Sequence, residues 1–360
     1  MGMTRQPTIG VLLVNFGGPQ SPSELEPFLR ELLSDVLPGP PFLRRWIAPT
    51  LARLRAAKMQ GPYEAIGWSQ VVSTHHRQVA LLREALGPEA PRIASGMMFT
   101  APTMQDAVRD LGDVERIVAV PMFPQYSLAT TQTAFNLAWE AMGAQGLQDR
   151  PITWISSWFD HPDYIEALAT TIRTGVAATP GDGPLHLVFT PHGLPRSFVT
   201  RGDPYPEQIR QSVRRVIARL GWTGPWWLGW QSRVGPSRWL EPSTPDVLSR
   251  LGTEGVRRVC LVPISFLSEH IETLFEVDVE YRAIAHAAGI SHFGRAPTIG
   301  EEPHLIRALA DLVTRAVQPG APSAGCVRCL LPQPDAFRRL PACPTCGFPN
   351  PAWLREGRAE

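Results

Sequence analysis

The sequence predicts an α/β fold of the doubly wound type, in which helices cover both faces of parallel sheets. Short and nearly continuous apolar runs, as in buried parallel strands, recur along the chain. Longer segments with spaced apolar positions, as in helices, lie between these runs. Strands that alternate with helices in this way form a parallel sheet. The length of 360 residues suits two domains of ordinary size.

Five runs are predicted strands because nearly every side chain in them is apolar, as burial on both faces requires. In chain order they are Ile9–Phe16, Ile117–Phe123, Leu185–Thr190, Trp226–Trp230 and Val259–Ile264. Five further segments are predicted helices because their apolar residues recur at helical spacing. These are Ser21–Leu33, Thr74–Leu86, Met104–Leu111, Pro206–Leu220 and Pro303–Val317.

Two pairs of similar segments predict two related lobes. Val114–Pro121 resembles Val256–Pro263, and Phe16–Pro19 resembles His192–Pro195. In each pair a strand ends and the same turn follows, so the first residues of the two turns are expected at matching strand ends. Ligands of such folds bind outside the carboxyl ends of the strands. We expect one lobe over residues 1–150, a second over 151–318, and a cysteine-rich tail over 319–360.

Composition narrows the class of protein. The chain is 44% hydrophobic and 19% charged, which is normal for a globular core. Its formal net charge of +1 gives no electrostatic reason to expect a nucleic acid partner. The run Ile9–Phe16 is too short for a signal-peptide core or a membrane span, and no other apolar run is long enough to span a membrane. We therefore expect a cytoplasmic protein.

His192 directly follows a predicted strand, between Pro191 and Pro195, which stiffen the turn. Gly193 is expected to supply a backbone conformation that other residues resist. An imidazole held at a strand end can accept a proton near neutral pH or bind a transition metal. The alternative is a hydrogen-bonded structural histidine, which is the commoner role of an isolated histidine.

The segment Phe266–Tyr281 is a predicted helix with Ser268 as its N-cap. Glu272, Glu276 and Glu280 recur every four residues, so they would form a carboxylate ridge along one side of an α-helix. An inward ridge would attract a divalent cation or pass protons in steps. The alternative is a solvated face of a surface helix, which charge runs usually are.

Two other strand-end segments carry candidate binding residues. Trp239 offers a flat ring for stacking on a flat ligand, although most of the 11 tryptophans must be core or turn residues. The loop that follows Pro121 leads to Thr130 and Thr131. Their hydroxyls would either hold ligand carboxylates or cap the next helix.

Four cysteines near the C-terminus form two pairs separated by 13 residues, a spacing typical of a metal site. They are Cys326, Cys329, Cys343 and Cys346. Four thiolates suit Zn²⁺ or an iron–sulfur cluster such as [2Fe–2S], and the sequence leaves both open. Cys260 lies within a predicted strand and is expected to be a small buried hydrophobic residue.

Taken together, these motifs resemble the ferrochelatase family from about Ile9 to Val317. The matching segments are Gly10–Pro19, Pro124–Ser127, His192–Pro195, Gly202–Tyr205, Gln231–Pro236 and Glu269–Leu274. The resemblance implies two Rossmann-like lobes of the chelatase type, with a porphyrin held in the cleft between them. It also implies an enzyme, a lyase of haem biosynthesis, that inserts its substrate Fe²⁺ into protoporphyrin IX or coproporphyrin III.

The resemblance further implies roles for individual residues. His192 and Glu272 match the family's active-site pair, which would hold the iron and take up porphyrin protons. Glu276 and Glu280 match an acidic row that would act as a relay. The residues expected to contact the porphyrin are Phe16, Tyr63, Ser69, Thr131, Trp239 and Phe266.

Some positions depart from the family pattern. Phe16 stands where many relatives carry tyrosine, which leaves the identity of the porphyrin open. Trp68 interrupts a run of small residues, and Met98 stands where many relatives place a basic residue. The segment Pro40–Leu54 combines apolar and arginine side chains. It would either touch a membrane or a haem-pathway partner, or pack as an ordinary surface helix.

Two rival functions remain at this stage. One is another tetrapyrrole metal chelatase, such as a cobaltochelatase for corrin precursors. The motifs Gln231–Pro236 and Glu269–Leu274 argue against it. The other is a non-catalytic haem carrier, against which the presence of both His192 and Glu272 argues.

Overall fold

The computed structural model describes residues 8–37, 40–235 and 237–318, so the four tail cysteines lie outside the described residues. Contacts divide the chain into two compact units. Of the described residues, the first unit comprises 8–17, Gln78–Trp158 and 306–318. The second unit comprises Gly18–Arg77 and Phe159–Leu305. The lobe boundaries after residues 150 and 318 stay predictions.

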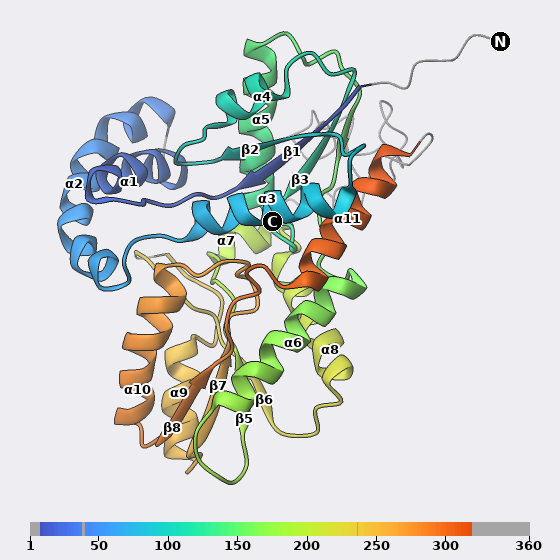
Figure 1. Ribbon diagram of the computed structural model, residues 1–360. Coiled ribbons are helices and arrows are strands. Elements are labelled where there is room, and N and C mark those ends of the chain that lie inside the picture. Colours follow the sequence, from blue (N-terminus) through green and yellow to red (C-terminus); the bar gives the residue numbers. More distant parts are fainter. Residues whose placement is uncertain (1–7, 38–39, 236, 319–360) are drawn as a thin grey trace. The chain divides into compact units, whose positions relative to one another are not determined.

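The first unit contains a four-stranded sheet of order β2-β1-β3-β4, in which all neighbours are parallel (Figure 1). Its strands are β1 (Ile9–Asn15), β2 (Arg92–Met97), β3 (Arg116–Pro121) and β4 (Ile152–Trp154). The two strands predicted here, β1 and β3, are confirmed. Both are almost fully buried, because their side chains are apolar on both faces.

Helices lie on both faces of this sheet, with α4 and α5 on one side and α3 and α11 on the other (Figure 1). The elements are α3 (Val71–Leu86), α4 (Met104–Leu111), the π-helix η1 (Leu128–Gln132), α5 (Thr133–Ala144) and α11 (Pro303–Val317). The chain passes between the two units within α3 and within α11. The predicted helices α3, α4 and α11 are confirmed.

The second unit contains a parallel sheet of order β6-β5-β7-β8. Its strands are β5 (His186–Phe189), β6 (Trp226–Leu228), β7 (Arg258–Val262) and β8 (His292–Arg295). The three predicted strands, β5, β6 and β7, are confirmed, although β6 and β7 end two residues earlier than expected.

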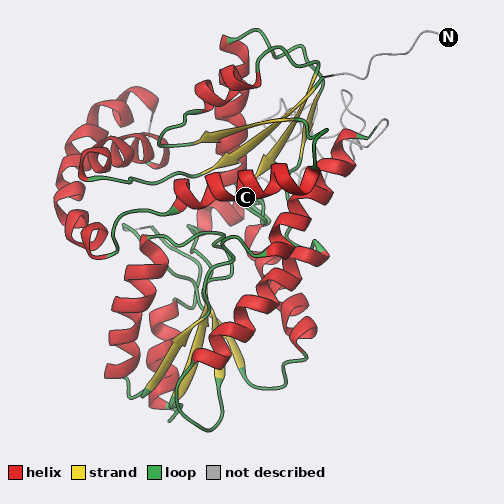
Figure 2. Cartoon of the chain, in the orientation of Figure 1, coloured by secondary structure: helices red, strands yellow, loops and turns green. Residues whose placement is uncertain are grey.

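Helices cover both faces of this sheet, with α9 and α10 on one side and α6 and α8 on the other (Figure 1 and Figure 2). The helices of the unit are α1 (Pro22–Val36), α2 (Pro41–Ala65), α6 (Pro162–Ala178), α7 (Arg196–Thr200), α8 (Tyr205–Leu220), α9 (Thr244–Thr253), the π-helix η2 (Glu272–Tyr281) and α10 (Arg282–Ala287). Helices α6 and α8 pack on each other, as do α9 and α10. No described helix has the length and hydropathy needed to cross a bilayer.

One apolar core of the second unit connects the sheet to η2. Val277 and Tyr281 of η2 pack in a single cluster with residues of β5, β7, β8 and α9. The cluster contains Val188, Val247, Leu248, Leu251, Val259, Leu261, Val277, Tyr281, Ala285, Ile290 and Phe293. Burial of this apolar surface anchors the inner side of η2. The polar residues of η2 are thereby held in fixed positions at the end of the sheet.

The two units repeat one plan. In the first sheet β1 is second in the strand order and lies between β2 and β3. In the second sheet β5 is second in the strand order and lies between β6 and β7. β1 therefore corresponds to β5, and β3 corresponds to β7, as the sequence similarities predicted. A π-helix follows β3 in the first unit and β7 in the second.

Candidate active site

His192 lies in the turn after β5, and its backbone is held on both sides. Its N–H donates to Ser265 Oγ at 3.0 Å, and its carbonyl accepts from Tyr205 Oη at 3.1 Å. The expectation that Gly193 supplies a backbone conformation that other residues resist is wrong, because its φ is not positive. A Cβ there would lie 2.7 Å from the carbonyl oxygen of Gln231, so the glycine is needed for close approach.

Glu272 is the first residue of η2, and here the predicted α-helix with Ser268 as its cap is wrong. Ser268 lies in the turn before the helix, whose preceding residue Ile271 makes no side-chain cap. Thr273 orders this start instead, because its hydroxyl accepts from the N–H of His270 at 2.9 Å and donates to Glu269 at 2.6 Å. π-Helices are rare and often occur at functional sites.

The structure brings His192 and Glu272 together. His192 Nε2 lies 3.3 Å from Glu272 Oε1, and the two side chains are 40% and 25% exposed. The other ring nitrogen of His192, Nδ1, lies 2.5 Å from the carbonyl oxygen of Gly193. An imidazolium can donate to both oxygens at once. The pair is therefore both fixed in geometry and open to a ligand.

The two groups hold each other in their charged forms. Burial opposes the imidazolium, but the carboxylate of Glu272 outweighs it and raises the pKa of His192 to about 9. Burial likewise opposes the carboxylate, but the positive charge and hydrogen bond of His192 hold the pKa of Glu272 well below its usual range. Without metal, the pair is an imidazolium–carboxylate ion pair at neutral pH.

His270 is a third ionisable side chain of the site, beside the Glu272 carboxylate. It was not among the site residues predicted from the sequence. Its Nδ1 lies 3.6 Å from Glu272 Oε2, on the other oxygen from His192. The residue is 8% exposed, and among the described residues neither ring nitrogen has a hydrogen-bond partner. Glu272 thus lies between two imidazoles. The signal was its position in the Glu269–Leu274 motif, two residues before Glu272.

Glu276 is bound at both oxygens. The N–H of Ser232 donates to Oε1 at 2.8 Å and its hydroxyl to Oε2 at 2.5 Å, while Tyr281 Oη donates to Oε1 at 2.5 Å. Burial and the charge of Glu272 raise the pKa of Glu276 despite these hydrogen bonds. Residues four apart do not lie directly above one another in a π-helix, since its hydrogen bonds run from i to i+5. Glu280 is exposed.

Gln231 connects the pieces of the site. Its Oε1 accepts from the Thr190 hydroxyl at 2.8 Å, and its Nε2 donates to the carbonyl of Glu272 at 3.1 Å. The side chain therefore joins the loop after β6 to the end of β5 and to the first turn of η2. The sequence pointed to the motif that contains Gln231 but not to this connecting role.

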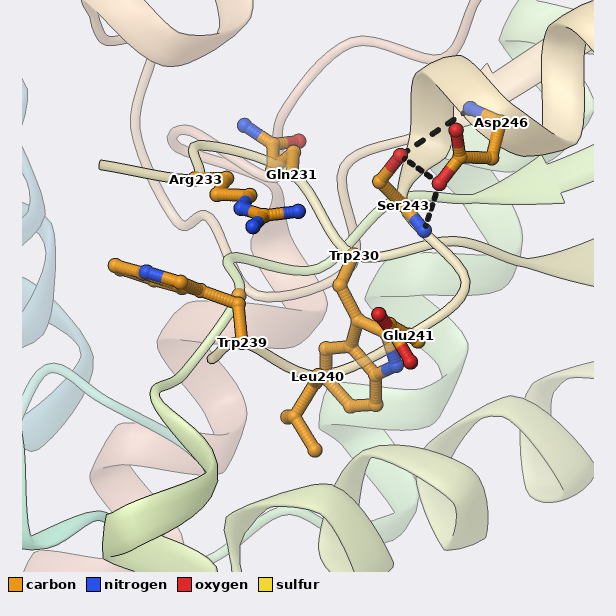
Figure 3. A pocket seen from close by; sticks show the side chains of 9 residues that line it. Trp230, Gln231, Arg233, Trp239, Leu240, Glu241, Ser243 and Asp246 are labelled. Carbon is orange, nitrogen blue, oxygen red and sulfur yellow. Dashed lines mark hydrogen bonds between the residues drawn. The ribbon is translucent and has the colours of Figure 1, made fainter. Parts of the chain in front are cut away.

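Trp239 belongs to the site, because its indole ring lies 6.3 Å from the His192 ring, centroid to centroid. Its Nε1 donates to the carbonyl of Val234 at 3.0 Å, which fixes the ring. Phe266 is half-buried in the turn between β7 and η2. A small pocket lies beside the Trp239 ring, and Trp230 and Arg233 also line it (Figure 3). Neither His192 nor Glu272 is among its lining residues.

Tyr63 and Ser69 also lie in the second unit and are buried, at 2% and 6% exposure. Burial raises the pKa of Tyr63, and the carboxylate of Glu272 raises it further, so the two side chains are within electrostatic reach. Ser69 packs against Gly18, where a Cβ would lie 2.2 Å from the serine hydroxyl and 3.8 Å from His270 Nε2. Ser69 therefore lies near His270, and the part of both residues in substrate binding stays a prediction.

Phe16 and Thr131 belong to the first unit. Phe16 follows β1 and packs edge-on against Phe99, with ring centroids 4.9 Å apart. Thr131 lies in η1 and is fully buried, and its hydroxyl has no hydrogen-bond partner among the described residues. Their part in substrate binding stays a prediction.

Comparison with known proteins identifies the family of this chain. A family model described as Ferrochelatase matches residues 8–317. A protein named ferrochelatase from Geotalea uraniireducens is 39% identical over 313 residues, which cover 85% of this chain and 97% of that protein. One from Thermosynechococcus vestitus is 40% identical over 324 residues, which cover 86% of this chain and 82% of that protein.

Solved structures show the same fold at low identity. SirB from Bacillus subtilis with Fe³⁺ has a TM-score of 0.51 and 13% identity, covering 86% of this chain and 96% of that chain. The family match spans nearly all the described residues, and the relatives are more than a third identical along most of their length. The chain belongs to the ferrochelatase family.

Proposed function

We propose that this ferrochelatase inserts Fe²⁺ into its porphyrin at the His192–Glu272 pair. The observation that carries the proposal is the contact of 3.3 Å between His192 Nε2 and Glu272 Oε1, beside the Trp239 ring. Insertion requires a site that holds the ion, accepts two pyrrole protons and fixes a flat ring. An imidazole, a carboxylate and an indole supply these three functions.

The charges of the metal-free pair define the order of events. At neutral pH the imidazolium of His192 cannot accept a proton, because its pKa is about 9. The Glu272 carboxylate is ionised and attracts Fe²⁺. The ion's charge then lowers the pKa of the neighbouring imidazolium, which releases its proton. The neutral His192 first binds the iron transiently. Once the iron has passed to the porphyrin, His192 Nε2 takes up one pyrrole proton and the Glu272 carboxylate takes up the other.

Glu276 and Glu280 form the proposed route for protons to solvent. A carboxyl group with a raised pKa, such as Glu276, exchanges protons more readily near neutral pH than an ordinary one. Glu280 is exposed at the far side of this row. Protons would thus pass from the Glu272 end of η2 towards water.

Four aromatic and polar side chains of the second unit are the proposed porphyrin contacts, namely Tyr63, Ser69, Trp239 and Phe266. A rigid aromatic surface can hold a distorted macrocycle, whose nitrogen lone pairs are more open to the ion than those of a planar ring. Phe16 and Thr131 are proposed to contribute from the first unit.

An anaerobic insertion assay tests the function. The protein is incubated with Fe²⁺ and either protoporphyrin IX or coproporphyrin III, and loss of the free-base absorption is followed. Turnover with at least one porphyrin is expected, and the ratio identifies the preferred one. Turnover only with Co²⁺ and a corrin precursor would indicate the cobaltochelatase, and haem binding without any insertion would indicate a carrier.

The four tail cysteines are proposed to bind one metal centre, through Cys326, Cys329, Cys343 and Cys346. Paired cysteines at this spacing support the proposal. The visible absorption spectrum of the purified protein separates the two candidates, because a [2Fe–2S] cluster is coloured and Zn²⁺ is not. Metal analysis that finds neither iron nor zinc at one site per chain would refute the proposal.

We also propose that the protein is cytoplasmic and that α2 touches an anionic membrane surface. Phe42 and Trp46 lie one turn apart on α2 and are 76% and 79% exposed. Arg45, Arg55 and Lys58 share the helix. Exposed aromatic rings beside basic side chains are typical of helices that lie on anionic lipid.

Sedimentation with phosphatidylglycerol vesicles tests the membrane contact. The double variant Phe42→Ser, Trp46→Ser is expected to bind at least about tenfold more weakly, because two apolar rings no longer enter the lipid. Trp226→Ser, at an exposed tryptophan of β6, serves as the control. Equal binding by wild type and the double variant would refute the contact and leave a protein partner as the occupant. Cell fractionation tests the location.

A further inference from the structure

Trp68 has a backbone conformation that its side chain disfavours. Its φ is +72°, and among the described residues only Ser232 shares a positive φ without being glycine. A bulky residue at positive φ is a conformational outlier, because its Cβ crowds the backbone. Gly67, with φ +69°, shows the residue type that such a turn ordinarily uses. The indole at position 68 is therefore kept at a cost to the fold.

The turn itself does not need the indole. Its hydrogen bonds are made by the backbone, since the N–H of Trp68 donates to the carbonyl of Tyr63 at 2.9 Å and that of Ser69 to the carbonyl of Pro19 at 3.0 Å. A glycine at position 68 would keep both bonds. The ring instead stacks on Tyr63, with centroids 5.8 Å apart and planes 14° from parallel.

This stacked pair lies beside the proposed reaction site. The Tyr63 phenol is within electrostatic reach of Glu272. Ser69, the residue after Trp68, lies against Gly18, and a Cβ at Gly18 would also lie 3.8 Å from His270 Nε2. All these residues belong to the second unit. Ser69 and His270 therefore face the same side of Gly18, which places the turn near the histidine beside Glu272.

We propose that Trp68 is a specificity residue that selects the porphyrin by its peripheral groups. Strain that the hydrogen bonds of the turn do not require is a reason to look for a role in function. Trp68 is only half-buried, so part of its ring is open to a ligand. The inference rests on the proposed function, because it assumes that a porphyrin occupies the space beside Glu272.

The chemistry of the indole sets the direction of the preference. An apolar ring stabilises a vinyl or methyl group against it, whereas a carboxylate there would lose water without gaining a hydrogen bond. Trp68 therefore favours protoporphyrin IX, which has two vinyl groups, over coproporphyrin III, which has four propionates. The smaller glycine would remove this bias.

The test compares kcat/KM for the two porphyrins in wild type, Trp68→Gly and Trp68→Asn. Glycine and asparagine both tolerate positive φ, so both variants are expected to fold, with a thermal midpoint no lower than that of wild type. The ratio of kcat/KM for protoporphyrin IX to that for coproporphyrin III is expected to fall about tenfold, as for loss of one apolar contact. Trp68→Phe keeps an aromatic ring and should retain most of the bias.

Trp222→Gly is the matched control, because Trp222 is also half-buried but precedes β6, at the opposite end of the strands from His192. Its ratio should equal that of wild type. An unchanged ratio in active Trp68→Gly would overturn the proposal, as would unfolding of both small variants, since the turn would then need the indole. Absence of insertion by wild type with either porphyrin would instead count against the proposed function.

Discussion

Ser232 binds both carboxylate oxygens of Glu276. Its N–H donates to one oxygen at 2.8 Å and its hydroxyl donates to the other at 2.5 Å. The serine has φ +63°, and this strained conformation aims the N–H and the hydroxyl at the same group. The loop after β6 thereby holds the second carboxylate of η2 in one orientation.

Loss of the serine hydroxyl should slow the proton route more than it weakens porphyrin binding. Ser232→Ala removes one hydrogen bond to a charged group, which is worth about a tenfold fall in kcat. The KM for porphyrin is expected to stay within about twofold. Ser237→Ala, in the exposed part of the same loop, is the control. Steady-state kinetics check this, and a change confined to KM would contradict it.

Removal of the imidazole should abolish insertion without unfolding the protein. His192→Ala is expected to lower kcat by about 10²–10⁴, as for loss of an acid–base group. The thermal midpoint should change little, because the side chain is 40% exposed. His286→Ala, on the exposed side of α10, should retain full activity. Near-normal turnover of His192→Ala would refute the assignment of this residue.

Neutralising the carboxylate should release the proton of His192 at lower pH. In metal-free Glu272→Gln, the pKa of His192 is expected to fall from about 9 towards its ordinary value of 6.5, because burial lowers it and only the weaker effects of the Gly193 carbonyl and of Glu276 still raise it. Histidine NMR titration measures the shift. Glu280→Gln, at the exposed carboxylate, should leave the pKa near 9. A pKa that stays near 9 in Glu272→Gln would mean that another group holds the proton.

The buried ion pairs of Arg295 should be important for stability. Its guanidinium contacts Asp278 at 2.9 Å and Glu269 at 3.0 Å, and its side chain is 11% exposed. Arg295→Met leaves two partly buried carboxylates without their cation, so the free energy of unfolding should fall by about 3–5 kcal/mol. Urea unfolding measures it. Arg250→Met breaks the exposed pair with Glu254 and should lower it by about 0–1 kcal/mol.

Buried His75 should make the fold sensitive to acid. Burial, together with the charge of His76, lowers the pKa of His75 from 6.5 to about 3. Between these values the unfolded chain binds a proton that the folded chain refuses, so stability falls as the pH falls. At pH 5.5 this costs about 1 kcal/mol relative to neutral pH. His75→Gln should show a smaller loss between pH 7 and pH 5.5 in urea unfolding.

The strands that the sequence predicted are those whose side chains are apolar on both faces, such as β1 and β3. β2 and β8 were not predicted. Ser95 and Gly96 interrupt the apolar run of β2, and β8 has a polar residue at each end, His292 and Arg295. Their strand conformation comes from pairing with β1 and β7, which is a tertiary effect.

The site was predictable where chemistry lies in short motifs, as for His192 and Glu272. The hydrogen bonds from Ser232 to Glu276 were not predictable, because Ser232 is 44 positions away in the chain and only the fold brings it close. The π-helical form of η2 was also hidden. Its apolar residues fit an α-helical pattern equally well, and the wider turn depends on contacts such as those of Val277 and Tyr281 with the core.

The shared strand order, with a π-helix after β3 and after β7, has a consequence for descent. Such a design is what the fusion of two copies of one ancestral gene would produce. Once joined, the copies were free to diverge: η2 carries Glu272 and Glu276, whereas the corresponding η1 carries Thr130 and Thr131 and no acidic residue. Of the two corresponding π-helices, only the one in the second unit therefore carries carboxylates that could bind an incoming cation.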